Sequence, residues 1–330
     1  MRKNVSRSIL LFITIIVIFL IFLSYFIITN RQSNNSKTKP SEKEVLNSNK
    51  IKYSDCRRCF TYLVYPSNQT SVDLIIYVHG GGFVGGSALD KNSLELKEFF
   101  TKRGFAFASV EYRVYPQVNL TEILGDISKG VKTIFKYLDD NGIRVKRAIY
   151  IGSSAGAIAG ALLIYALPHP RLDISIYMDG FIGFSGGYCA SYLPENLLKN
   201  SKLHNISMKY MMPFDDTDFK AARRVPALLI NGVKDRLLDA NPGEVNHHAL
   251  CMEKWLKEHG ILVKILLLPT GHGTLSYLTR GDNITVTTVM EFINSLKPLE
   301  DLVAYWSFDE LMGGKEVDSI NGYIGYVTEK

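Results

Sequence analysis

The sequence has 330 residues, of which 46% are hydrophobic and 21% are charged. These proportions lie in the ordinary globular range, and the length allows one large hydrophobic core or two modest ones. The net charge of +6 is spread along the chain. Its densest local run is only Arg57-Arg58 with Lys52 nearby, which does not make a nucleic-acid-binding surface, so we expect no nucleic-acid partner.

The N-terminus carries a long apolar segment. Residues 9–28 are almost entirely apolar, and such a run matches the roughly 30 Å hydrocarbon thickness of a bilayer. We expect residues 1–29 to form a retained signal anchor with one transmembrane helix. A cleaved signal peptide is the alternative, but its apolar core would be unusually long and no small-x-small cleavage site follows Phe26.

A polar segment follows the apolar one. Residues 30–50 are rich in Asn, Ser and Lys, so they cannot bury a core and are predicted to be a flexible stalk. The catalytic domain is predicted to span residues 51–299. Positive charges nearly balance across the apolar run and only slightly favour a domain outside the cytoplasm. The expected localisation is a single-pass membrane protein with an extracytoplasmic domain.

The chain has four cysteines: Cys56, Cys59, Cys189 and Cys251. An even number suits disulfides in an oxidising compartment, although the sequence leaves the pairing open. The spacing of Cys56 and Cys59 also occurs in zinc sites, but the other two cysteines lie far apart and no histidine has zinc-finger spacing. We therefore expect no metal and a structural or incidental role.

The region after residue 51 alternates short apolar runs with helical patterns. Residues 74–78 (L-I-I-Y-V) read as a strand that is buried on both faces of a parallel sheet. Similar strands are predicted at 105–110, 147–151, 174–178, 227–231 and 263–268. Helices are predicted at 92–103, 120–141, 154–166, 246–260 and 286–296. This alternation predicts an α/β fold whose mostly parallel sheet has helices on both faces.

A glycine-rich run follows the first strong strand and begins His79-Gly80-Gly81-Gly82-Phe83. Glycines let backbone N–H groups approach a bound oxyanion closely, and we assign Gly81 and Gly82, with Ala155, as its donors. Each such donor stabilises a transition state by about 3 to 4 kcal/mol. A phosphate-binding loop is the alternative, but neither G-x-G-x-x-G nor a P-loop lysine is present.

The sequence Gly152-Ser153-Ser154-Ala155-Gly156 joins a predicted strand to an Ala- and Gly-rich helix. This is G-x-S-x-G in the setting that a nucleophile elbow requires. The sharp turn crowds the backbone, so glycines relieve clashes while Ser154 projects its hydroxyl. The strand-turn-helix setting makes Ser154 the predicted nucleophile.

Residues 186–223 interrupt the alternating pattern and are predicted to be a small cap insertion. Tyr188, Tyr210 and Met211 give this segment adaptable apolar surface. We expect these three side chains and Phe83 to contact the substrate. The alternative is an irregular surface excursion with a small core of its own.

A serine nucleophile needs a histidine to take its proton and a carboxylate to orient that histidine. In folds with a G-x-S-x-G nucleophile elbow, the triad residues follow along the chain in the order serine, acid, histidine. Asp235 follows the strand 227–231, and His272 follows the next strand, so these two complete the predicted triad. Asp239 is the competing acid. Three histidines within one helical pattern are expected to be surface or packing residues: His247, His248 and His259.

These motifs resemble the carboxylesterase branch of the α/β hydrolases, with hormone-sensitive-lipase-like, feruloyl-esterase-like and prenylcysteine-methylesterase-like members. H-G-G-G-F, G-x-S-A-G, G-x-x-D and G-H-G appear in that order, and Tyr112-Arg113-Val114-Tyr115-Pro116-Gln117 is similar to the Y-R-x-x-P-Q stretch of the methylesterase-like members. The resemblance covers residues 62–296 and implies an α/β-hydrolase fold and ester hydrolysis.

The tail, residues 300–330, resembles the opening of a concanavalin- or laminin-G-like β-sandwich but is too short for one. It is interpreted as part of a longer second domain, with a frayed β tail as the alternative.

The sequence predicts a serine carboxylic-ester hydrolase that acts without a cofactor on a lipophilic or small acyl ester. Its oligomeric state is not assigned. One alternative is an amidase, peptidase or formamidase with the same triad. The other is a catalytically silent hydrolase fold that serves as a surface binding protein.

Overall fold

The computed structural model describes residues 46–166, 170–195, 197, 212–214, 218 and 221–297, together with two short backbone strands in the tail. The predicted anchor, residues 1–29, and residues 30–45 of the predicted stalk lie outside the described residues. Within the described part of the chain, no helix has the length and apolar character needed to cross a membrane.

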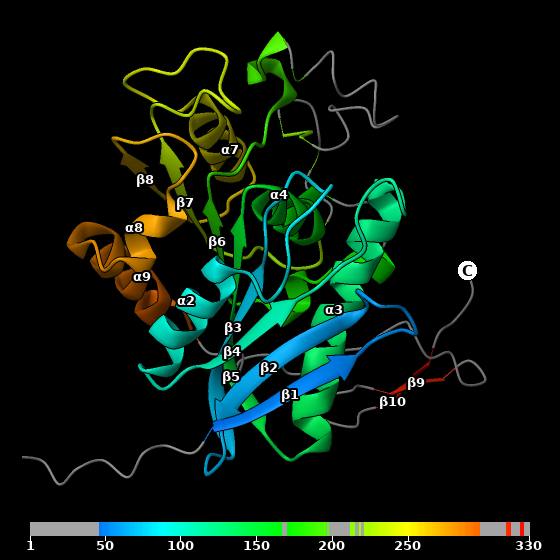
Figure 1. Cartoon of the computed structure of the whole chain (residues 1–330). Coiled ribbons are helices and arrows are strands. Elements are labelled where there is room, and N and C mark those ends of the chain that lie inside the picture. Colours follow the sequence, from blue (N-terminus) through cyan, green and yellow to red (C-terminus); the bar gives the residue numbers. More distant parts are fainter. Residues whose placement is uncertain are drawn as a thin grey trace, which may run out of the picture. The chain divides into compact units, whose positions relative to one another are not determined.

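An eight-stranded sheet forms the centre of the described domain (Figure 1), in the order β1-β2-β4-β3-β5-β6-β7-β8. The first two strands, β1 and β2, run antiparallel to each other, and β2 runs antiparallel to β4. All other neighbours are parallel. The strands are β1 (Leu46–Lys52), β2 (Phe60–Pro66), β3 (Ser71–Val78), β4 (Ala106–Val110), β5 (Arg144–Ser153), β6 (Gly180–Phe184), β7 (Ala227–Gly232) and β8 (Val263–Leu268).

Helices cover both faces of this sheet. One face packs against α3 (Leu120–Asp140), α4 (Ala155–Ala161) and α7 (His247–Glu258). The other packs against α2 (Lys91–Thr101), α8 (Leu275–Thr279) and α9 (Asn283–Ser295). Along β3, alternate residues enter the two cores, as the period of two in a strand requires. The predicted α/β architecture with a mostly parallel sheet is confirmed.

Helix starts agree with local capping chemistry. At α3, the Asn119 side chain accepts from the Glu122 N–H, and the Glu122 carboxylate accepts from the Asn119 N–H, which is a capping box. Asn246 caps α7 by accepting from the Ala249 N–H. Short helical turns complete the described elements: a π-helical turn Leu162–Ala166 after α4, and 3-10 turns Pro170–Leu172, Ser175–Tyr177 and Ala190–Tyr192.

One predicted strand is wrong. Residues 174–178 do not form a strand, because they contain the 3-10 turn Ser175–Tyr177, and the sheet is continued by β6. This strand reads G-F-I-G-F, and its glycines hide the β pattern. They are needed for packing: a Cβ at Gly180 would meet Leu296 Cδ1 at 2.5 Å, and one at Gly183 would meet Tyr188 Oη at 2.2 Å.

The N-terminal boundary of the domain also differs from the prediction. The strand β1 begins at Leu46, so the last residues of the predicted stalk, 46–50, belong to the sheet. This strand lies at the edge of the sheet and alternates exposed and half-buried side chains. An edge strand that buries so little apolar surface carries no strong sequence signal.

The four cysteines form two disulfides. Cys56–Cys59 closes the connection between β1 and β2, and Cys189–Cys251 ties the segment after β6 to α7. The tail contains a separate antiparallel pair, β9 (Lys315–Val317) with β10 (Ile324–Tyr326).

Candidate active site

Ser154 occupies the turn between β5 and α4. Its backbone has φ 53° and ψ −117°, a region that non-glycine residues rarely adopt. The turn is so tight that a Cβ at Gly152 would meet the Gly156 carbonyl oxygen at 2.4 Å, and one at Gly156 would meet the Val78 carbonyl oxygen at 2.1 Å. Both glycines are therefore sterically required to hold the serine in this conformation.

Ser154, His272 and Asp235 form one continuous hydrogen-bonded chain. His272 Nε2 lies 2.8 Å from Ser154 Oγ, and His272 Nδ1 lies 2.7 Å from Asp235 Oδ2. Asp235 is fully buried. Because a carboxylate only accepts, His272 Nδ1 must carry the proton of that bond. In a neutral imidazole this leaves Nε2 as an acceptor for the serine hydroxyl, which is the arrangement that lets serine lose its proton.

Asp235 is fixed by the loop that follows β7. Its Oδ1 accepts from the N–H groups of Leu237 (3.0 Å) and Leu238 (3.3 Å). The strand ends at Gly232, where a Cβ would meet the Gly271 carbonyl oxygen at 2.1 Å. The glycine thus allows the backbone before His272 to approach the acid loop.

The His272 loop is held by a hydroxyl pair that sequence reasoning missed. Ser185 Oγ donates to the His272 carbonyl oxygen (2.5 Å) and lies 2.7 Å from Thr274 Oγ1. Both residues are buried, and Ser185 has a positive φ of 49°. The only signal in the sequence is a serine directly after a glycine-rich strand, at the edge of the sheet where functional residues gather.

The glycine loop, residues 79–88, presents backbone N–H groups in a defined direction. The Gly81 carbonyl accepts from the N–H groups of Val84 (3.0 Å) and Gly85 (3.1 Å). His79 Nδ1 donates to the Gly80 carbonyl oxygen (2.8 Å). In a trans peptide the C=O and N–H point in opposite directions, so these two anchored carbonyls direct the N–H groups of Gly81 and Gly82 away from their anchors.

This loop passes directly against the serine. A Cβ at Gly80 would lie 3.1 Å from Ser154 Cβ. Ala155 begins α4, where the first N–H groups have no partner inside the helix. Among the described residues, no protein acceptor is found for the N–H groups of Gly81, Gly82 or Ala155. The three groups assigned from the sequence therefore remain free to bind an anion.

Solved structures of two esterases resemble this chain in fold. Esterase B from Lactobacillus rhamnosis has a TM-score of 0.57 and 15% identity, with 84% of this chain and 93% of that chain covered. Thermogutta terrifontis esterase 2 has a TM-score of 0.56 and 17% identity, with 78% and 96% covered. These likenesses show the α/β-hydrolase fold.

Sequence relatives point to the same group. The BD-FAE family model matches residues 62–179, which hold the glycine loop and the elbow. An ethyl acetate hydrolase from Pseudomonas putida is 22% identical over 59% of this chain and 63% of its own length. An isoprenylcysteine alpha-carbonyl methylesterase from Arabidopsis thaliana is 27% identical over 49% of this chain and 39% of its own. The chain is thus similar to esterases in sequence and in fold. It spans less than two thirds of the length of these two relatives.

The competing acid, Asp239, has another partner. Asp239 accepts from the His247 N–H (2.8 Å), and His247 Nδ1 lies 3.0 Å from both of its oxygens. Asp239 is thus engaged with the start of α7 rather than with His272.

His248 is a buried packing residue, as expected. Its Nδ1 accepts from the N–H groups of Tyr188 and Cys189, and its Nε2 donates to the Leu238 carbonyl. Burial lowers the pKa of His248, although the Leu238 carbonyl and nearby carboxylates oppose the shift. Its neutral ring connects the predicted cap to the acid loop.

The structure describes two of the four residues that were predicted to contact substrate. Tyr210 and Met211 lie outside the described residues. Phe83 and Tyr188 are both fully buried in the core that contains α3, α4 and α7. Phe83 has a positive φ of 64°, and its side chain packs in that core. Both side chains are thus core residues in this structure, and their contact with substrate stays a prediction.

The described parts of the predicted cap pack onto the domain. Met212 and Phe214 are buried in the same core as Tyr188, and a β-bridge joins Cys189 to Pro213. Within the described part of the chain, no group of three or more His, Cys, Asp and Glu side chains is arranged to hold a metal ion.

Proposed function

We propose that this chain is a serine carboxylic-ester hydrolase with Ser154, His272 and Asp235 as its catalytic triad. The observation that carries the proposal is the hydrogen-bonded chain from Ser154 Oγ through both ring nitrogens of His272 to Asp235. The similarity of the chain to esterases supports it independently.

In this mechanism Ser154 Oγ attacks the ester carbonyl while its proton passes to His272 Nε2. The imidazolium then donates that proton to the alkoxide that leaves, and an acyl-enzyme remains on Ser154. A water molecule then attacks the acyl carbon while His272 takes one of its protons. The second tetrahedral intermediate collapses, the bond to Ser154 Oγ breaks, His272 returns the proton to Ser154 Oγ, and the carboxylic acid is released. Asp235 holds the ring and stabilises its charged form.

The negative charge of each tetrahedral intermediate is proposed to bind the N–H groups of Gly81, Gly82 and Ala155. These donors belong to backbone that is already fixed by other hydrogen bonds. A donor that needs no reorientation stabilises the developing charge most strongly.

The proposed substrate is a lipophilic or small acyl ester. A relative named for ethyl acetate and relatives named for isoprenylcysteine methyl esters support both ends of this range. A series of p-nitrophenyl esters with acyl chains of increasing length would place the chain within it.

We also propose that residues 1–29 anchor the domain on the outer side of a membrane. The apolar run 9–28 supports an anchor, and two disulfides suit an oxidising compartment. Full-length protein should remain in the membrane fraction after an alkaline carbonate wash, whereas a chain that starts at Leu46 should be soluble and active. Release of the full-length protein by the wash would overturn the anchor.

The catalytic proposal is tested by comparing Ser154→Ala with Ser153→Ala on p-nitrophenyl acetate and on the matching anilide. Ser154→Ala should abolish ester hydrolysis, while Ser153→Ala should retain measurable activity. Turnover of the anilide at a rate similar to the ester would favour an amidase. Absence of any hydrolysis by the parent chain on esters and amides would favour a silent binding protein.

A further inference from the structure

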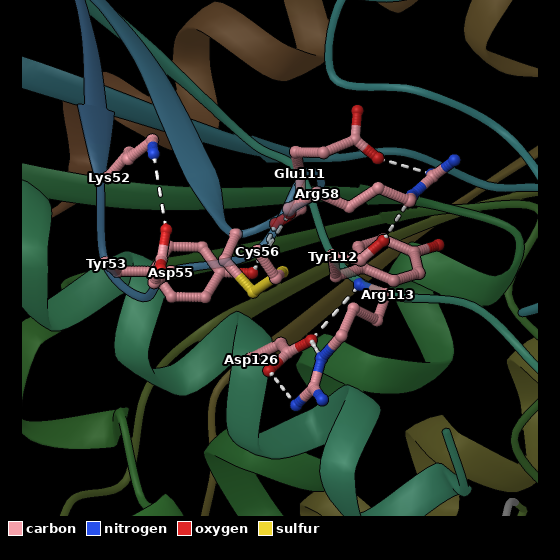
Figure 2. The surroundings of a disulfide bond; sticks show 10 residues. Lys52, Tyr53, Asp55, Cys56, Arg58, Glu111, Tyr112, Arg113 and Asp126 are labelled. Atoms are coloured by element: carbon pink, nitrogen blue, oxygen red, sulfur yellow. Dashed lines mark hydrogen bonds and ion pairs between the residues drawn. A yellow bond between two sulfur atoms is a disulfide. The ribbon is translucent and has the colours of Figure 1, made fainter. Parts of the chain in front are cut away.

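The connection between β1 and β2 carries Arg58, whose side chain reaches Glu111 and Tyr112 (Figure 2) and also the glycine loop. Arg58 Nε donates to the Tyr112 carbonyl (2.8 Å), and one terminal nitrogen donates to the Gly86 carbonyl (2.8 Å). The same nitrogen pairs with Glu111 Oε1. Only 26% of the Arg58 side chain is exposed, and only 4% of the Glu111 side chain.

Glu111 in turn holds the end of the glycine loop. Its Oε2 accepts from the Ala88 N–H (2.8 Å) and from Ser87 Oγ (3.0 Å). Burial alone would raise the pKa of Glu111, but the His79 ring, the Ala88 N–H and the charge of Arg58 together hold it below its ordinary value. A buried carboxylate that lost its arginine would be poorly compensated.

Gly86 connects the contacts of Arg58 and Glu111 to the peptide that precedes Gly81, whose N–H group is a candidate oxyanion donor. Gly86 has φ +94°, and a Cβ there would meet the Gly80 carbonyl oxygen at 2.2 Å and His79 Nδ1 at 2.4 Å. Gly86 therefore packs against the peptide unit whose other end is the Gly81 N–H. A displacement of Gly86 towards that peptide would therefore displace the peptide as well.

The Cys56–Cys59 disulfide holds the segment that carries Arg58. Within the closed turn the Cys59 N–H donates to the Cys56 carbonyl (3.3 Å). The Tyr53 hydroxyl donates to the Glu111 carbonyl (2.8 Å) and lies 3.4 Å from the Arg58 carbonyl oxygen. Burial raises the pKa of Tyr53, so its hydroxyl remains a donor. The disulfide turn and Glu111 are thus connected through the Tyr53 hydroxyl as well as through Arg58.

We propose that Arg58 is a positioning residue for the oxyanion donors of the glycine loop, and that the Cys56–Cys59 disulfide acts on catalysis through Arg58. The inference rests on the proposed hydrolase function. It assigns a catalytic consequence to a disulfide and an arginine that lie outside the triad and carry no family motif.

The first test compares Arg58→Gln, Arg58→Lys and the control Arg147→Gln in the chain that starts at Leu46 and in the full chain. Arg147 makes a similar part-buried ion pair with Asp73, near the start of β5 and away from the glycine loop. Arg58→Gln should lower kcat for p-nitrophenyl acetate at least tenfold with KM changed less than twofold, because the donors act on the transition state. Arg58→Lys should recover part of the loss, and Arg147→Gln should lower only thermal stability.

Two further variants test the coupling. In Arg58→Gln/Glu111→Gln no buried charge is left uncompensated, so kcat should be higher than the product of the two single losses predicts. Cys56→Ser/Cys59→Ser should lower kcat in the parent chain, but should have little further effect when Arg58 is already Gln. If the losses of kcat multiply in both comparisons, the disulfide and Glu111 act independently of Arg58, and the proposal is overturned.

Hydrogen exchange separates this inference from the hydrolase proposal. Peptides that cover residues 79–90 should exchange faster in Arg58→Gln than in the parent chain, and at the parent rate in Arg147→Gln. Unchanged exchange and unchanged kcat in Arg58→Gln, with the parent chain active, would overturn the role of Arg58 alone. A parent chain that hydrolyses nothing would refute the hydrolase proposal, while exchange would still decide whether Arg58 holds the loop.

Discussion

The two sides of the candidate site are fastened by different kinds of contact. The glycine loop is held by a buried carboxylate, Glu111, that is compensated by Arg58. The loop that carries His272 is held by the neutral hydroxyls of Ser185 and Thr274. Removing one partner of a charged pair leaves a buried charge, which costs more than an unpaired hydroxyl or carbonyl. We therefore expect the position of the glycine loop to depend on the charge of Arg58 and Glu111. The position of the His272 loop should depend on the individual hydrogen bonds of Ser185 and Thr274.

The largest effect should come from Asp235, the carboxylate that is hydrogen-bonded to His272. Asp235→Asn should lower kcat by about 10⁴, as in a serine protease, because an amide favours the wrong tautomer of the imidazole. The control is Asp239→Asn, whose partner is His247, and its kcat should stay within about threefold of the parent value by the small effects typical outside a site. A large loss in the control with a nearly normal Asp235→Asn would reverse the assignment.

The next largest effect should come from the glycine loop. Gly81 has φ +116°, and a Cβ there would meet the Gly85 carbonyl oxygen at 2.3 Å, so Gly81→Ala should misplace an oxyanion donor. Loss of one donor lowers kcat by about 10² to 10³.

Gly85→Ala is the matched control for this glycine, because a Cβ at Gly85 meets nothing within 4 Å. Steady-state kinetics with p-nitrophenyl acetate should show a near-parent kcat for Gly85→Ala. Equal kcat values for the two variants would show that the conformation of Gly81 has no part in catalysis.

A smaller effect is expected on the histidine loop. Ser185→Ala removes the hydroxyl that donates to the His272 carbonyl, and should lower the free energy of unfolding by about 1 kcal/mol and kcat by about tenfold or less. Ser276→Ala removes a comparable but exposed bond to the Gly273 carbonyl and should change neither. If the two variants behave alike in chemical denaturation and in kinetics, Ser185 does not position His272.

The smallest effect should appear only as a pH dependence. Burial holds the folded pKa of His248 below its ordinary value of about 6.5. Below about pH 6.5 the His248 ring is therefore protonated more readily in the unfolded chain than in the folded chain. The stabilising contribution is complete above about pH 6.5 and is lost as the pH falls towards the folded pKa.

Urea denaturation between pH 7.5 and pH 5 tests this sign. His248→Gln should show a shallower fall of the free energy of unfolding with decreasing pH than the parent chain. Parallel slopes for the parent chain and His248→Gln would show that the buried ring does not contribute.

The sequence predicted the parts of the site that local patterns encode. The elbow at Ser154 is a strand, a turn and a helix within a few residues, and chain order then indicates Asp235 and His272. The glycine loop is likewise continuous in sequence. Each of these patterns has a steric or chemical reason at its own position, so one sequence was enough to find it.

The supporting residues were missed because their partners are remote in sequence. Arg58 acts on Glu111, 53 positions later, and Ser185 on the His272 carbonyl, 87 positions later. The strand β6 was missed because its glycines serve tertiary packing against Leu296 and Tyr188. The sequence also does not show that Phe83, which was predicted to contact substrate, combines a positive φ with a side chain buried in the core.

The central claim is that Ser154 is the nucleophile, and covalent labelling tests it most directly. The parent chain is incubated with a fluorophosphonate, and the adduct is located by peptide mass spectrometry, alongside Ser154→Ala and Ser153→Ala. We predict one adduct per chain on Ser154, retained in Ser153→Ala and absent from an inactive Ser154→Ala. An adduct on Ser153 or elsewhere, with Ser154→Ala still hydrolysing p-nitrophenyl acetate, would contradict the mechanism.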